Sequence, residues 1–107
     1  MIKYNKLIRD RIPEIVEESG KKCIIEIMDE SDYIKALDIE LNEELAEYQS
    51  DKSIEELADL LEVIYSVAKA RGYSVQELER IRTEKAEKRG SFDKRILLKG
   101  VYNNEDD

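Results

Sequence analysis

The chain has 107 residues, of which 41% are apolar and 41% are charged, a mixture that is typical of one soluble helical domain. It contains no histidine and a single cysteine, Cys23, which excludes histidine-dependent nucleophile systems and zinc sites built from histidine and cysteine. Any metal site must therefore use oxygen ligands, which suit magnesium or manganese. The net charge of −8 argues against general nucleic-acid binding.

The sequence also predicts where the protein is found. No apolar run approaches the ~18 residues of a membrane span, and the opening "MIKYNKLIRD" lacks the apolar stretch of a secretory signal. The lone cysteine cannot form an internal disulfide, as is usual in a reducing compartment. We therefore expect a cytoplasmic protein without a membrane partner.

Start and stop residues predict a short helix and a long one in the first half of the chain. Pro13 stands in the first turn of the short helix, which Gly20 closes. Between these two helices, residues 22–28 are rich in β-branched side chains and are expected to be extended. Ser31 is the expected N-cap of the long helix, which runs to about Tyr48 and is followed by a tight polar turn, "QSDK".

Two further helices carry the Ser-x-x-Glu capping box at their starts. Ser53 and Glu56 open a helix that runs to about residue 71, where Gly72 ends it. The same signature at 74–77 opens a helix that runs to about residue 89, before Gly90. A second extended segment is expected near 92–98. We assign residues 1–102 to one mainly all-α domain of antiparallel helices and residues 103–107 to a disordered tail.

Acidic residues three or four positions apart stand beside apolar stripes in the two central helices. In the helix from residue 31, Glu40, Glu44 and Glu47 lie on one shoulder of the stripe, about 60–120° from Leu41. In the helix from residue 53, Glu56 projects into the apolar sector and Asp59 lies at its edge, whereas Glu55 and Glu62 face solvent.

A short turn makes these helices antiparallel neighbours, so the two acidic pairs are expected to face each other. No lysine or arginine lies between residues 53 and 68 to offset their repulsion. Spacing alone leaves two interpretations open: a metal site, or a solvated face that forms salt bridges.

The motif "EELAE" (residues 43–47) followed by "ELAD" (residues 56–59) resembles the E-E-x-x-E … E-x-x-D signature of the all-α nucleoside triphosphate pyrophosphohydrolases. This superfamily includes MazG, the dimeric dUTPases and phosphoribosyl-ATP pyrophosphohydrolase. The segments "YNKLIRDRIPEIVEESG" and "KAEKRGSFDKRILL" resemble its MazG-like, phosphoribosyl-ATP-pyrophosphohydrolase-like branch, so that the likeness covers about residues 4–98.

The resemblance implies a helical bundle that is completed by dimerisation and often assembles further into a tetramer. It also implies magnesium-dependent hydrolysis of a nucleoside triphosphate to a monophosphate and pyrophosphate, as in cleansing of the nucleotide pool. By position in the motif, Glu44, Glu47, Glu56 and Asp59 would be the metal ligands, with Glu43 in a supporting role at most.

This chemistry needs a base to activate the attacking water and cations to hold the phosphates. Glu44 and Glu40 are the candidate bases. Six basic residues are the candidate phosphate ligands: Lys85, Lys88, Arg89 and Arg95, followed by Arg9 and Arg11. Tyr33, Tyr48, Tyr65 and Phe92 could stack on a base. Two alternatives remain: hydrolysis of phosphoribosyl-ATP or of another nucleotide diphosphate, and a catalytically silent helical interaction module.

Overall fold

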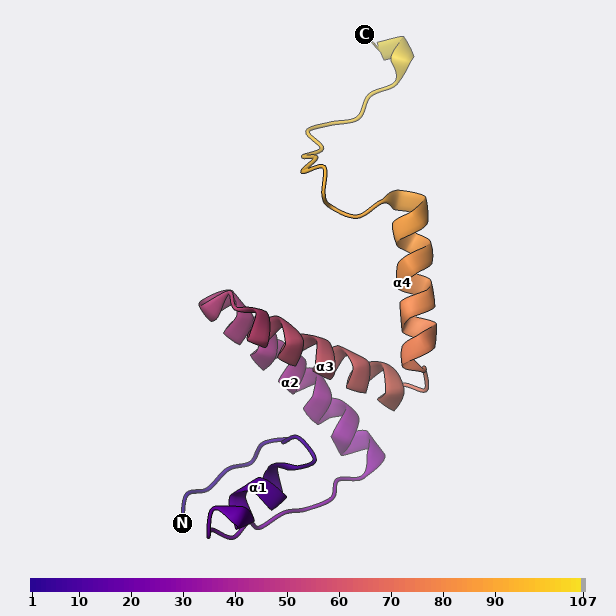
Figure 1. Cartoon of the computed structure of the whole chain (residues 1–107). Helices are drawn as coiled ribbons and strands as arrows, with labels where there is room; N and C mark the ends of the chain where they lie inside the picture. The colour runs from indigo at the N-terminus through magenta and orange to yellow at the C-terminus, as the bar shows by residue number, and fades with distance from the viewer. Residues whose placement is uncertain (107) are drawn as a thin grey trace. The chain divides into compact units, whose positions relative to one another are not determined.

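The computed structural model of the chain describes residues 1–106, and its regular structure is entirely helical within that range. Figure 1 shows the helices α1 (Ile12–Glu18), α2 (Glu30–Asp51), α3 (Ile54–Ala70) and α4 (Val75–Arg89), followed by the short 3-10 helix η1 (Asn104–Asp106). The predicted all-α class is therefore confirmed, whereas dimerisation stays a prediction. No helix in this range has the length and apolar character needed to cross a membrane.

The chain divides into two compact units, Met1–Val75 and Gln76–Asp107. The first contains α1, α2 and α3. The second contains nearly all of α4 and the segment that follows it. Of the predicted tail, Asn104–Asp106 form η1, and residue 107 lies outside the described residues. Each unit is considered by itself below.

The core of the first unit is a hairpin of two long helices, α2 and α3, which pack side by side in antiparallel directions (Figure 1). The connection between them is only two residues long, Lys52 and Ser53. Lys52 adopts the left-handed conformation, with φ of 57°, and its backbone N–H donates to the Tyr48 carbonyl at 2.7 Å. This arrangement closes α2 in the way that glycine usually does.

The start of α3 follows the predicted capping box. The Ser53 hydroxyl accepts a hydrogen bond from the backbone N–H of Glu56 at 3.3 Å, and acidic residues occupy the first turn, where they favour the helix dipole. At the other end, Gly72 has φ of 92°, a left-handed conformation that costs glycine little. The predicted bounds of α3 are confirmed at both ends.

The bounds of α2 differ from the prediction at both ends. Its N-cap is Asp29, not Ser31, because the Asp29 carboxylate accepts a hydrogen bond from the backbone N–H of Asp32 at 2.8 Å. The helix also continues to Asp51, so most of the predicted polar turn "QSDK" is helical. Asp and Ser are about equally favourable as N-caps, so the sequence pattern alone does not decide between Asp29 and Ser31.

The two segments that were expected to be extended, 22–28 and 92–98, do not form strands. A β-branched run favours the extended conformation, but a strand also needs a partner for its backbone hydrogen bonds. The helices flanking these segments do form where predicted: α1 has Pro in its first turn, and α4 ends at Arg89 before Gly90. Within α4, the ion pairs Arg80–Glu84 and Arg82–Glu79 follow helical spacing.

Little apolar surface of the hairpin is fully buried. Leu37 of α2, with 4% of its surface exposed, is the one buried apolar side chain among residues 1–105. In α3, Leu57 and Leu61 from the predicted apolar sector remain 41% and 44% exposed. The stability of the hairpin should therefore depend strongly on local features such as its caps.

We predict that Ser53→Ala destabilises the protein by about 0.5–2 kcal/mol, because it removes the side-chain cap of α3. Ser50→Ala in the last turn of α2 is the matched control, and it should change stability by less than about 0.5 kcal/mol. Urea unfolding followed by circular dichroism measures both. Equal effects of the two substitutions would contradict the capping role of Ser53.

Candidate functional site

Three carboxylates converge between α2 and α3. One oxygen atom from each of Glu44, Glu56 and Asp59 lies within 4.8 Å of the other two, and all three side chains are partly buried. Glu44 comes from the second half of α2, and the other two come from the first two turns of α3. The tight connection at Lys52 and Ser53 brings these turns together, as the sequence predicts.

Two oxygen atoms of this cluster lack any hydrogen-bond partner. The Oε2 atoms of Glu44 and Glu56 are buried from solvent and accept no hydrogen bond. An ionised oxygen in such a position is unfavourable, because it has lost water without gaining a donor. A bound cation or a proton would relieve this cost.

The same crowding raises the pKa of Glu44 to about 7, from 4.5. The largest cause is burial of the carboxyl, followed by a hydrogen bond with Glu40 and the negative charges of Glu47 and Asp59. Burial also raises the pKa of Glu56, together with the charge of Glu47 and a hydrogen bond to it. Both shifts favour the neutral acid, since a proton removes the repulsion.

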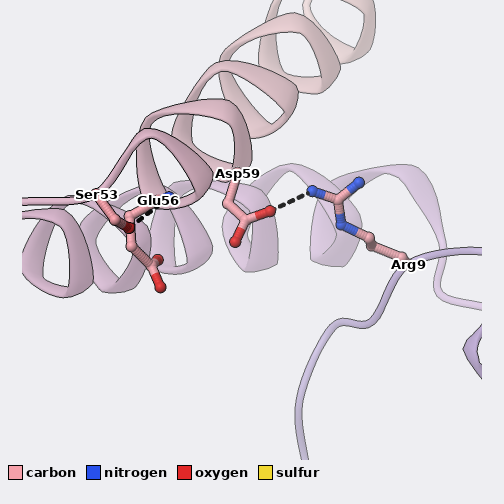
Figure 2. A network of polar contacts seen from close by, with 4 residues as sticks. All are labelled: Arg9, Ser53, Glu56 and Asp59. Atoms are coloured by element: carbon pink, nitrogen blue, oxygen red, sulfur yellow. Dashed lines mark hydrogen bonds and ion pairs between the residues drawn. The ribbon is translucent and has the colours of Figure 1, made fainter. Parts of the chain in front are cut away.

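Asp59 alone of the three has a basic partner in the described chain. Figure 2 shows Glu56 and Asp59 projecting from α3, with Asp59 directed at the guanidinium of Arg9 from the N-terminal segment. The Arg9 Nη2 atom donates to Asp59 Oδ1 at 2.7 Å. Both side chains are substantially exposed, at 59% for Arg9 and 42% for Asp59.

The other predicted acids lie around this centre. Glu47, a predicted metal ligand, is not one of the three converging residues, but its charge and hydrogen bonding act on Glu56. Glu40, the second candidate base, is hydrogen-bonded with Glu44. Glu43 lies 3.8 Å from the Lys6 ammonium, which agrees with a supporting position outside the centre. The structure thus surrounds the triad with further negative charge.

The predicted phosphate ligands are distributed over both units. Arg9 contacts the acidic cluster, whereas Arg11 is 82% exposed and lies 3.4 Å from Glu14 of its own helix. The other four belong to the second unit: Lys85, Lys88 and Arg89 in the last two turns of α4, and Arg95 in the segment after it. All four are exposed, and their role in phosphate binding stays a prediction.

A small open hollow of about 280 Å³ lies along α3 next to Arg9. Arg9 lines it together with four residues of α3: Ala58, Leu61, Glu62 and Tyr65. Tyr65 is therefore the one of the four candidate stacking residues that borders this hollow, while Phe92 is 95% exposed and Tyr48 lies under the Lys52 ammonium at 5.4 Å. Sequence reasoning placed Glu62 on a solvated face, and it is exposed, but it also borders the hollow.

The donor set fits magnesium. This ion prefers six oxygen ligands at about 2.0–2.1 Å, so that opposite ligands lie about 4.2 Å apart. Adjacent ligands lie about 2.9 Å apart in the same geometry, so the three converging oxygens, which lie within 4.8 Å of one another, would move closer together around the ion. The unpartnered oxygens of Glu44 and Glu56 would then gain a cation.

The contact between Arg9 and Asp59 was not predicted from the sequence. The two residues stand 50 positions apart, and a helical projection reports only on neighbours within one helix. The contribution of Asp51 to the raised pKa of Glu56 was also missed, because Asp51 was assigned to a turn and not to α2. The first eleven residues contain four basic side chains, Lys3, Lys6, Arg9 and Arg11, against Asp10 alone, and this basic stretch was the available signal for a partner of the acidic residues on α2 and α3.

Comparisons with known proteins leave the family of the chain open. A stretch of 45 residues is 42% identical to part of an uncharacterized protein of Mycolicibacterium smegmatis, and it covers 42% of this chain and 46% of that protein. The match thus spans about half the length of the relative. No family model and no solved structure matches the chain. The resemblance to the pyrophosphohydrolases therefore stays a prediction.

We predict that the metal-free protein becomes less stable as the pH rises from about 5 to about 8. The pKa of Glu44 is higher in the folded state, so its stabilising effect is complete below 4.5 and is lost as the pH passes through about 7. The loss should be on the order of 1–3 kcal/mol, and Glu44→Gln should abolish most of it.

Urea unfolding at a series of pH values in the presence of EDTA measures this dependence. Glu55→Gln, at an exposed position in the first turn of α3, is the matched control and should retain the wild-type slope. A slope that is unchanged in Glu44→Gln would show that another group is responsible.

Proposed function

We propose that this chain is a magnesium-dependent nucleotide pyrophosphohydrolase, which cleaves a nucleoside triphosphate to a monophosphate and pyrophosphate. The observation that carries the proposal is the pair of buried, unpartnered carboxylate oxygens on facing helices, Glu44 Oε2 and Glu56 Oε2, within a convergent triad. The motif resemblance supplies the reaction class.

The charge balance favours a metal over a salt-bridge network. Residues 36–51 and 53–68 contain no lysine or arginine, and Lys52 between them has its ammonium over the Tyr48 ring. Arg9 contributes one positive charge, and it is directed at Asp59. Glu44 and Glu56 would still carry uncompensated charge at neutral pH, and a divalent cation offsets this charge without needing a proton.

In this proposal Glu44, Glu56 and Asp59 hold the magnesium, and Glu47, the fourth predicted ligand, adds negative charge that acts on Glu56. Bound there, magnesium would supply positive charge to the triphosphate oxygens and make a water molecule more acidic. Glu44 and Glu40 are hydrogen-bonded to each other, and one of them would accept the proton of the attacking water.

The hollow next to Arg9 favours a substrate that has an apolar face. It is lined by Tyr65, Leu61 and Ala58, and its volume of about 280 Å³ is near the lower limit for small-molecule sites. Such a space accommodates one ring system better than a whole nucleotide. Phosphoribosyl-ATP and nucleotide diphosphates remain alternative substrates, because they also place a phosphoanhydride next to a base.

We predict that the protein releases pyrophosphate from at least one nucleotide in the presence of magnesium and that EDTA abolishes this release. The panel should contain the canonical, deoxy and modified nucleoside triphosphates together with phosphoribosyl-ATP. Glu56→Gln should lower kcat/KM by about 100-fold or more, because it removes a proposed ligand. Glu55→Gln makes the same chemical change on the adjacent, exposed residue and should leave kcat/KM within about twofold of wild type. Absence of release from every substrate would refute the proposal.

Stability separates the proposed enzyme from a catalytically silent interaction module. In EDTA, Glu56→Gln should raise the melting temperature, since it removes a charge from a crowded cluster. Magnesium should raise the melting temperature of the wild type and have little effect on Glu56→Gln. A structural salt-bridge network should instead lose stability with this substitution, and magnesium should add nothing to the wild type.

A further inference from the structure

We infer that Arg9 holds Asp59 in the absence of metal and transfers to the phosphates of the substrate when metal binds, so that it couples the two binding events. This inference rests on the proposed function and extends it to a residue outside the hairpin. The observation behind it is that the guanidinium of Arg9 already occupies one side of the candidate metal ligands, 2.7 Å from Asp59 Oδ1.

Arg9 and a divalent cation would compete for the same negative charge. A metal bound by Glu44, Glu56 and Asp59 would stand close to the guanidinium, and two positive groups on one carboxylate repel each other. Metal binding therefore weakens the contact between Arg9 and Asp59. Conversely, the contact reduces the charge that is available to the metal.

The contact is of a kind that exchanges readily. Arg9 and Asp59 are both more than two-fifths exposed, and exposed ion pairs contribute little to stability. Arg9 also precedes α1 and lies in a segment without regular structure, so its side chain can turn without disturbing either helix of the hairpin. Release of Arg9 should thus cost the fold little.

A released Arg9 has an anion to bind nearby. Besides contacting Asp59, Arg9 lines the hollow on α3 together with Tyr65, so the same side chain contacts a proposed metal ligand and borders the proposed substrate space. The planar guanidinium donates two parallel hydrogen bonds to phosphate oxygens, and a lysine cannot reproduce this geometry. Arg9 would therefore contact the triphosphate once metal has taken its place at Asp59.

The test is a calorimetric titration of Mn²⁺ into metal-free protein, with and without pyrophosphate. Arg9→Gln should bind Mn²⁺ alone about threefold more tightly than wild type, because the competing cation is gone. With Mn²⁺ present, the same variant should bind pyrophosphate about 10-fold more weakly or worse, because a charged donor is lost. Arg9→Lys should keep the Mn²⁺ affinity of the wild type and recover only part of the pyrophosphate affinity.

Arg71→Gln is the matched control. It removes another exposed Arg–Asp pair of the same unit, Arg71 with Asp38 at 3.2 Å, and should match the wild type in both titrations. If Arg9→Gln keeps its circular dichroism spectrum but binds Mn²⁺ as the wild type does, or more weakly, the inference is overturned while the proposed metal site stands. If neither the wild type nor Arg9→Gln binds Mn²⁺, both the inference and the proposed function fail.

Discussion

Repulsion among carboxylates on two facing helices is the constraint on which the candidate site depends. The α2–α3 hairpin would pack more easily with neutral residues at Glu44 and Glu56, yet it holds their Oε2 atoms away from solvent and without donors. The pKa values of both residues are raised for the same reason, since burial and neighbouring acids disfavour the ionised form. Two carboxylates that are held out of water, with few basic residues nearby, form a site suited to bind a cation, because the cation supplies the positive charge that the protein lacks there.

The apolar side chains that the hairpin leaves exposed to water are a second unfavourable feature of the first unit. Leu37 is buried, but Leu57 and Leu61 on α3 and Leu45 on α2 each remain more than two-fifths exposed. These side chains belong to the same apolar stripes that predict the helices, so their positions are not accidental. Burial of each would contribute on the order of 1 kcal/mol or more. The predicted dimer would bury these side chains.

The parts of the fold that local chemistry determines were the ones predictable from the sequence. Ser53 with Glu56, and the glycines at 72 and 90, mark helix ends because a cap or a left-handed turn involves only a few adjacent residues. Helical spacing likewise placed Glu44, Glu56 and Asp59 on facing surfaces. The pairing of Arg9 with Asp59 depends on the path of a segment without regular structure, and no periodic pattern encodes that path. The run at 22–28 forms no strand, because β-branched residues indicate a preference of the backbone and not the presence of a partner strand.

The two-residue connection at Lys52 and Ser53 also fixes the rotational phase of one helix relative to the other. Each residue of an α-helix advances the side-chain direction by about 100°, so one residue added to the start of α3 at this link would turn Glu56 and Asp59 away from Glu44 while leaving both helices intact. The link is already as short as two residues, and one of them, Lys52, is in the left-handed conformation. Loop length, which most surface connections can vary freely, is here part of the geometry of the site.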